Sequence, residues 1–168
     1  MSELAKMVQA NEDFAASFTE GELQIPPARG VAVLTCIDAR IDPAKVLGLQ
    51  IGDAHVLRNA GGRASDDALR SLLISSWLLG TREFTVIHHT DCGMTMFTND
   101  DLIQMVKEKK GEDVSDVDFL TIPDLDQSVR DDVERIRDLQ AKLPDGVTVS
   151  GQVYDVATGT LREVVAAG

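Results

Sequence analysis

The sequence predicts an α/β fold with a mostly parallel central sheet flanked by helices, an antiparallel edge hairpin at the C-terminus and an N-terminal helical arm. Three observations predict it. Short apolar segments alternate with longer amphipathic ones along residues 31–143, as in strand-helix-strand units whose strands pair in parallel. Two β-like segments then follow one another directly, as in a hairpin. An amphipathic N-terminal stretch is cut off from the rest by Pro26 and Pro27.

Helix and strand signals define the first half of the chain. Apolar residues at near-helical spacing predict the N-terminal helix. Ser65 is an expected N-cap, and Gly80 ends the helix that Ser65 begins. The expected elements are a helix over residues 3–18, a linker over 22–30, a strand over 31–36, a short helix over 43–47, a strand over 54–59 and a helix over 66–79.

In the second half, charge placement and apolar spacing carry the prediction. A helix with acidic residues first and lysines last suits the helix dipole. A later charged helix has a buried stripe made of Val129, Val133, Ile136 and Leu139. The expected elements are a strand over residues 84–88, a helix over 100–110, an irregular acidic stretch over 111–127, a helix over 128–143 and a hairpin of strands over 148–156 and 160–165.

Composition predicts one globular domain over residues 1–168, of which residues 1–25 are the arm and linker. Hydrophobic residues make up 43% of the chain, which is ordinary for a globular protein. With no bilayer-length apolar run and no signal-peptide pattern, we expect a cytoplasmic protein. The formal charge of −12 argues against nucleic acids and membranes as partners, because both favour a basic face.

Two cysteines and a histidine predict a zinc site. Cys36 follows one apolar strand, and His89 and Cys92 follow another, so all three are expected at the carboxyl ends of parallel strands. Two thiolates and an imidazole suit tetrahedral zinc and leave one coordination position open, as in catalytic sites. Either cysteine alone would more simply be a core residue. Their combined placement favours the metal.

Strand alternation adds a charged pair beside this set. Cys36, Asp38 and Arg40 share one side of an extended segment, so Arg40 can donate to the Asp38 carboxylate and hold it away from the metal. If the Arg40–Asp38 bond breaks, the Asp38 carboxylate can bind zinc instead. The simpler alternative is an exposed ion pair worth under about 1 kcal/mol. His89 is preferred to His88 as ligand because His88 projects to the opposite face and is expected to be structural.

These motifs resemble those of the β-class carbonic anhydrases, and the chain looks like the compact members of that class. The motifs that carry the resemblance are Cys36, Asp38 and Arg40; Arg58, Asn59, Ala60 and Gly61; and His89, Cys92 and Gly93. The resemblance implies one Zn²⁺ per chain on Cys36, His89 and Cys92, with Asp38 and Arg40 as the catalytic dyad. It implies the reversible hydration of carbon dioxide to bicarbonate and a proton by a zinc-bound hydroxide.

The resemblance also implies a homodimer or a higher even homo-oligomer, with the arm reaching across to the partner. His88 and Arg63 depart from the residues usual in the family. Met94 and Phe97 are the bulky residues expected near the metal. Three alternatives stay open: hydrolysis of carbonyl sulfide or carbon disulfide on the same scaffold, a non-catalytic zinc module with Asp38 as fourth ligand, and a dithiol redox protein that pairs Cys36 with Cys92.

Overall fold

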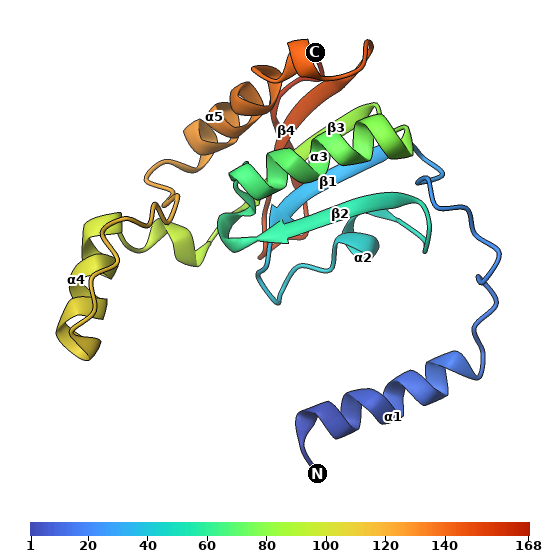
Figure 1. Ribbon diagram of the computed structural model, residues 1–168, viewed down its shortest axis with the longest axis horizontal. Helices are drawn as coiled ribbons and strands as arrows, with labels where there is room; N and C mark the ends of the chain where they lie inside the picture. Colours follow the sequence, from blue (N-terminus) through green and yellow to red (C-terminus); the bar gives the residue numbers. More distant parts are fainter.

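The computed structural model describes all residues, 1–168, and has the predicted α/β architecture around one five-stranded sheet. The strand order is β2-β1-β3-β4-β5 (Figure 1). The first four strands are parallel and the last pairs antiparallel with β4, so the predicted edge hairpin is confirmed. The strands are β1 (Val31–Cys36), β2 (Ala54–Asn59), β3 (Glu83–His89), β4 (Thr148–Tyr154) and β5 (Leu161–Val165).

Five α-helices accompany the sheet, and two of them, α3 and α5, cover the same face (Figure 1). Leu72 of α3 and Val133 of α5 pack there against Leu34 and Val86 of the sheet. The helices are α1 (Glu3–Ala15), α2 (Pro43–Leu47), α3 (Asp66–Leu79), α4 (Asn99–Lys110) and α5 (Leu125–Arg137). Single 3-10 turns lie at Ala60–Gly62, Gly93–Thr95 and Gln140–Lys142.

The opposite face of the sheet carries a smaller core, and this core contains both cysteines. Because side chains alternate along a strand, Val33 and Ile87 point to this face. Cys36, Cys92 and Ile122 join them, with Val46 and Leu47 of α2 packed alongside. The sulfur atoms therefore lie in an apolar environment at the carboxyl end of the sheet.

The helix at the expected position 128–143 differs most from its prediction. It begins at Leu125 because the Asp124 side chain accepts a hydrogen bond from the Gln127 N–H and caps the first turn. It ends at Arg137, and the 3-10 turn Gln140–Lys142 follows it. Of the predicted stripe, Val129, Val133 and Ile136 are buried, and Leu139 is partly buried.

The arm stands away from the rest of the molecule. Helix α1 ends at Ala15 instead of reaching Phe18, and none of its residues is buried. It lies well apart from the sheet at the end of a long connecting segment (Figure 1). Its apolar side chains Met7, Val8 and Phe14 are exposed. No helix in the protein is both long and apolar enough to cross a membrane.

Candidate metal centre

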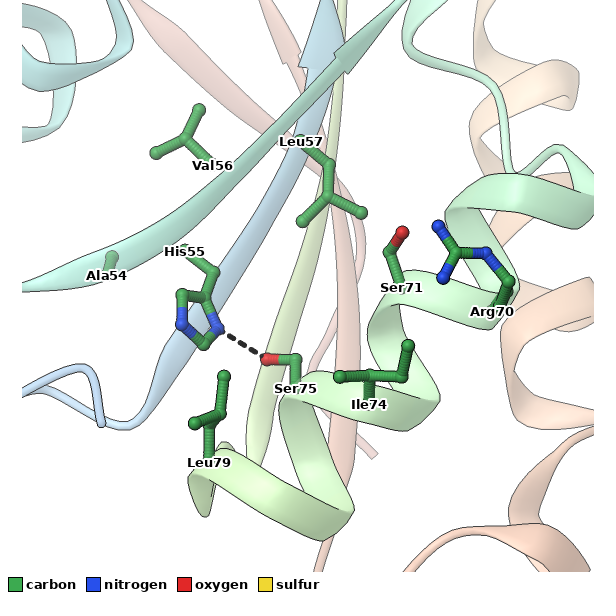
Figure 2. Close-up of a pocket in the computed structure, with 9 residues that line it drawn as sticks. All are labelled: Ala54, His55, Val56, Leu57, Arg70, Ser71, Ile74, Ser75 and Leu79. Carbon is green, nitrogen blue, oxygen red and sulfur yellow. Dashed lines mark hydrogen bonds between the residues drawn. The ribbon is translucent and has the colours of Figure 1, made fainter. Parts of the chain in front are cut away.

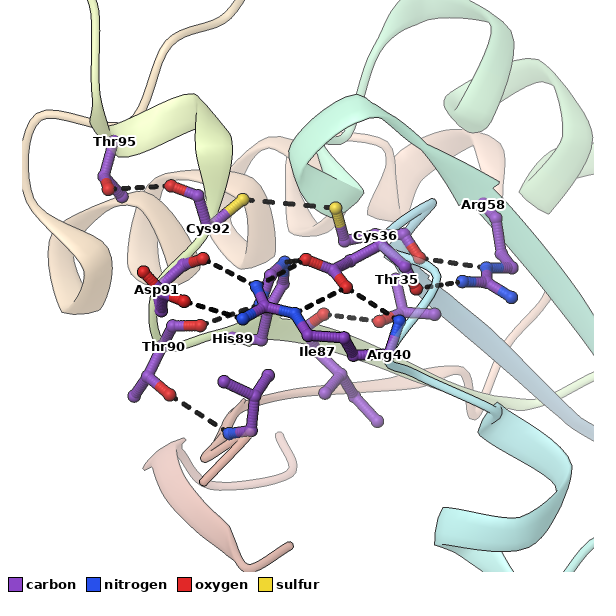
Figure 3. Close-up of polar contacts among 12 residues, drawn as sticks. Thr35, Cys36, Arg40, Arg58, Ile87, His89, Thr90, Asp91, Cys92 and Thr95 are labelled. Carbon is purple, nitrogen blue, oxygen red and sulfur yellow. Dashed lines mark hydrogen bonds and ion pairs between the residues drawn. The ribbon is translucent and has the colours of Figure 1, made fainter. Parts of the chain in front are cut away.

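The carboxyl ends of β1 and β3 bring the three predicted ligand residues together. These strands pair in parallel, so Cys36 and His89 emerge at the same edge, and Cys92 lies in the turn that follows β3 (Figure 3). The Cys36 and Cys92 sulfurs are 4.0 Å apart. The donor atoms of all three residues lie within 4.8 Å of one another, and all three residues are buried.

The imidazole of His89 is arranged as a ligand would be. Its Nδ1 donates to the carbonyl of Thr90 at 2.9 Å, so the lone pair is left on Nε2. That Nε2 is buried and has no hydrogen-bond partner. An unpaired buried nitrogen beside two sulfurs costs free energy unless something binds it. This donor set fits a zinc ion.

The two thiols share protons unequally. The hydrogen bond from the Cys92 thiol lowers the pKa of Cys36 to about 4 although burial opposes it, and the neighbouring His89 side chain and the backbone N–H groups of Asp38 and Gly61 lower it further. The same hydrogen bond raises the pKa of Cys92. The pair therefore holds one thiolate readily, and an arriving metal ion must displace the second proton.

A close backbone approach shapes the Cys36 side of the site. Gly62 has a φ of +70°, and a Cβ placed there would lie 2.8 Å from the Thr35 carbonyl carbon and 2.9 Å from the Cys36 nitrogen. Only glycine both adopts this positive φ readily and has no Cβ to clash with the end of β1. The turn after β2 can therefore pass directly over the end of β1.

Asp38 and Arg40 form the predicted pair beside the ligand atoms. Arg40 donates from Nε and Nη2 to the two carboxylate oxygens of Asp38, at 3.0 and 2.7 Å. These bonds hold the pKa of Asp38 well below its ordinary value and raise that of Arg40. Asp38 Oδ2 lies 3.8 Å from His89 Nε2, so the carboxylate borders the ligand set while bound to Arg40.

Two residues without a predicted role complete this site. Asp91 accepts from Arg40 Nη1 on its carboxylate at 2.6 Å and from Nη2 on its carbonyl at 2.8 Å, with a left-handed φ of +54° (Figure 3). Arg58 donates to the carbonyls of Cys36 and Asp38, at 2.9 and 2.8 Å. The sequence does show an acidic residue next to Cys92 and an arginine in the β2 motif. It does not show which groups these two residues bind.

A cavity of about 300 Å³ is lined in part by Cys36 and Cys92. Ile37, Met94 and Phe97 give it an apolar wall, so the two bulky residues expected near the metal do line it. A small uncharged molecule would find apolar contacts there and one carboxylate, that of Asp38.

No histidine lines this cavity, and His55 and His88 have partners elsewhere. His88 is fully buried on the opposite face of β3, where its ring nitrogens bond to Ser128 and Asp132. His55 bonds to Ser75 at 2.7 Å inside a hollow of about 450 Å³ between β2 and α3 (Figure 2). That hollow holds no cysteine or carboxylate, so it is not where the metal chemistry would occur.

Comparison with known proteins identifies similar chains. A family model described as carbonic anhydrase matches residues 31–161. Beta-carbonic anhydrase 1 of Mycobacterium tuberculosis is 42% identical over 154 residues, covering 92% of this chain and 93% of that protein. A carbon disulfide hydrolase of Saccharolobus solfataricus is 34% identical over 179 residues, covering 93% and 86%. The crystal structure of carbonic anhydrase from Streptococcus mutans aligns with a TM-score of 0.92 at 43% identity, covering 98% of both chains.

Proposed function

The chain belongs to the β-class carbonic anhydrase family, and from this premise we propose that Cys36, His89 and Cys92 hold its zinc ion while Asp38 and Arg40 orient the reacting water. The reaction is the reversible hydration of carbon dioxide to bicarbonate and a proton. The observation that carries the assignment is the buried, unpaired Nε2 of His89 beside two sulfurs 4.0 Å apart.

Each residue has a separate task. Zinc, when bound, supplies a Lewis acid that makes water nucleophilic near neutral pH. Arg40 keeps the Asp38 carboxylate ionised. The carboxylate accepts a hydrogen bond from that water and so orients a lone pair of the water oxygen toward the substrate carbon. The apolar wall of Ile37, Met94 and Phe97 holds carbon dioxide against it. Neither His55 nor His88 lines the cavity, so the released proton passes to buffer.

Zinc-loaded protein is expected to hydrate carbon dioxide far faster than it releases sulfide from carbon disulfide or carbonyl sulfide. The three substrates share a linear shape, but small apolar walls accept carbon dioxide without further adaptation. Stopped-flow hydration and sulfide release, measured on one sample at alkaline pH, test this. Negligible hydration beside rapid sulfide release would instead assign the chain to the chemistry of its carbon disulfide hydrolase relatives.

We also propose a dimer in which a second copy covers the arm and the β2 edge of the sheet. Strand β2 is at the open edge, and the hollow beside it has Val56 and Ile74 exposed on its wall. Trp77, on α3, is 62% exposed, and the arm buries none of its apolar residues. Several exposed apolar side chains on neighbouring elements are typical of a protein interface.

Deleting residues 1–20 is expected to weaken self-association and to lower activity with it. A milder test is Phe14→Asp in the full chain, which places a charge in the apolar stripe of α1. Sedimentation over a protein concentration series should show a larger monomer fraction for both variants. Lys6→Ala, which alters the polar side of the same helix, is the matched control and should sediment as wild type. Unchanged sedimentation of Phe14→Asp would mean that the arm has no part in assembly.

We further propose that residues 1–168 form one domain with residues 1–25 as its arm, and that the protein works in the cytoplasm. A single sheet contributes to both apolar cores, which supports the single domain. Cys36 and Cys92 are both free thiols. Ligand cysteines persist best in a reducing compartment, which supports the cytoplasmic location.

A further inference from the structure

A buried polar network lies behind the proposed metal centre, on the other face of β3. Its centre is Asp132 of α5, whose side chain is 4% exposed. His88 Nε2 donates to Asp132 at 3.1 Å, and Ser128, one turn earlier on α5, bonds to His88 Nδ1 at 2.8 Å. Arg63 reaches Asp132 from the turn after β2, with Nε at 2.7 Å and Nη2 at 3.3 Å. These bonds hold the pKa of Asp132 below its ordinary value although burial opposes them.

The third nitrogen of the Arg63 guanidinium engages another segment. Its Nη1 donates to the carbonyls of Leu120 and Thr121, at 2.7 and 3.0 Å. Leu120 has a φ of +53°, a left-handed conformation that is unfavourable for leucine. A strained residue persists only where its surroundings impose it, and here Arg63 holds its carbonyl. The guanidinium thus holds the carbonyl of Leu120, while the Asp118 carboxylate accepts from the Leu120 N–H at 2.9 Å.

This loop leads directly to the substrate cavity. Ile122, which follows Thr121, is 1% exposed, and its N–H donates to the Met94 carbonyl at 2.9 Å. A Cβ built on Gly61 would lie 3.2 Å from Ile122 Cδ1, from Met94 Cγ and from Arg63 Cγ, so these three side chains leave no room for a Cβ beside Gly61. Gly61 and Met94 both line the cavity. Ile122 therefore supports the cavity wall from behind.

We propose that Arg63 is a positioning residue for the carbon dioxide pocket, holding Ile122 against Gly61 and Met94 through the Leu120 and Thr121 carbonyls. The inference rests on the proposed function of the cavity. A buried ion pair is weak evidence for stability, since apolar residues of similar volume often do as well. What an apolar residue cannot supply is a planar fork that binds a carboxylate and two carbonyls at once. A lysine can pair with Asp132 but has no such fork.

The test compares Arg63→Lys with Arg162→Lys. Arg162 also binds both carboxylate oxygens of an aspartate of α5, Asp126, but it lies on β5 and is not among the residues that line the cavity. Methionine labelled with ¹³C at the methyl reports the wall directly, and Met94→Leu assigns the Met94 signal among the five methionines. In Arg63→Lys we expect this signal to shift and kcat/KM for carbon dioxide to fall by about 3- to 10-fold, mainly through KM. Zinc content and the pH profile should not change, and Arg162→Lys should match wild type.

An unmoved Met94 signal with unchanged kcat/KM in folded Arg63→Lys would overturn the proposal. If that variant does not fold, Ile122→Val replaces it, because it removes only the Cδ1 methyl that faces Gly61. The same methyl shift and rise in KM are expected, and their absence overturns the proposal equally. A wild-type protein without hydration activity would defeat the proposed function instead, while the methyl shift would still report whether Arg63 holds the wall.

Discussion

The His89→Ala protein is expected to lose its zinc and, with it, at least about 10³-fold of its carbon dioxide hydration rate. His89 supplies the only nitrogen in the ligand set, and the two sulfurs left behind cannot complete a tetrahedral site. Its Nε2 has no other partner in the fold, so no internal hydrogen bond of that nitrogen is lost on truncation. Zinc content after dialysis, measured by mass spectrometry alongside the rate, checks the expectation.

The neighbouring histidine is the control. His88→Ala removes a ring that is equally buried but bonds to Ser128 and Asp132 instead of facing the sulfurs. It should lower thermal stability, because Asp132 loses a partner in the interior, yet keep about one zinc per chain. Zinc retained in His89→Ala and lost in His88→Ala would reverse the ligand assignment.

The sheet can be predicted nearly residue by residue because its strands carry their own signal. The predicted bounds of Val31–Cys36 and Ala54–Asn59 agree with the strands found. The first of these is the buried strand β1, and buried parallel strands form nearly continuous apolar runs. The placement of Cys36 and of His89 with Cys92 follows, because parallel strands end at one edge. A site assembled from strand ends can thus be predicted from the amino-acid sequence.

The residues that support the site cannot be predicted in the same way. Arg63 and Asp132 are 69 positions apart, and nothing local indicates that one meets the other. Asp124 caps α5 from within an acidic stretch where several aspartates look alike, so the predicted helix start is too late. Asp91 binds Arg40 from a left-handed backbone conformation. An aspartate can adopt this conformation, but its presence in the sequence does not predict it. Long-range pairing and turn conformation are properties of the folded chain.

The sequence also does not determine whether the Asp38 carboxylate binds Arg40 or the metal ion. The structure shows the carboxylate bound to Arg40, which is itself held from the other side by Asp91. Two carboxylates on one guanidinium keep Arg40 in place, so Asp38 is restrained at the border of the ligand set. With Asp38 held in this way, a zinc ion on Cys36, His89 and Cys92 would keep a position for water, in contrast to a zinc module closed by Asp38.

Asp38→Asn is therefore expected to keep zinc and to lower kcat by about 10²-fold, because the amide no longer orients the reacting water as the carboxylate does. Arg40 holds the pKa of Asp38 well below its ordinary value, so Asp38 stays ionised from about pH 6 to about pH 9. Any rise in activity across that range comes from another group. The variant should then lower the whole pH–rate curve without moving its midpoint.

Arg40→Ala should also retain zinc and lose turnover, since Asp38 is then free to leave the position in which it orients water. Asp91→Asn is the matched control, because the Asp91 carbonyl still binds Arg40 and the Asp38 pairing is untouched; its loss should be only about 2- to 5-fold. Stopped-flow rates and zinc content across the pH series decide between these expectations. If Asp38→Asn or Arg40→Ala stayed within about twofold of wild type, the dyad would be an ordinary surface ion pair with no part in the reaction.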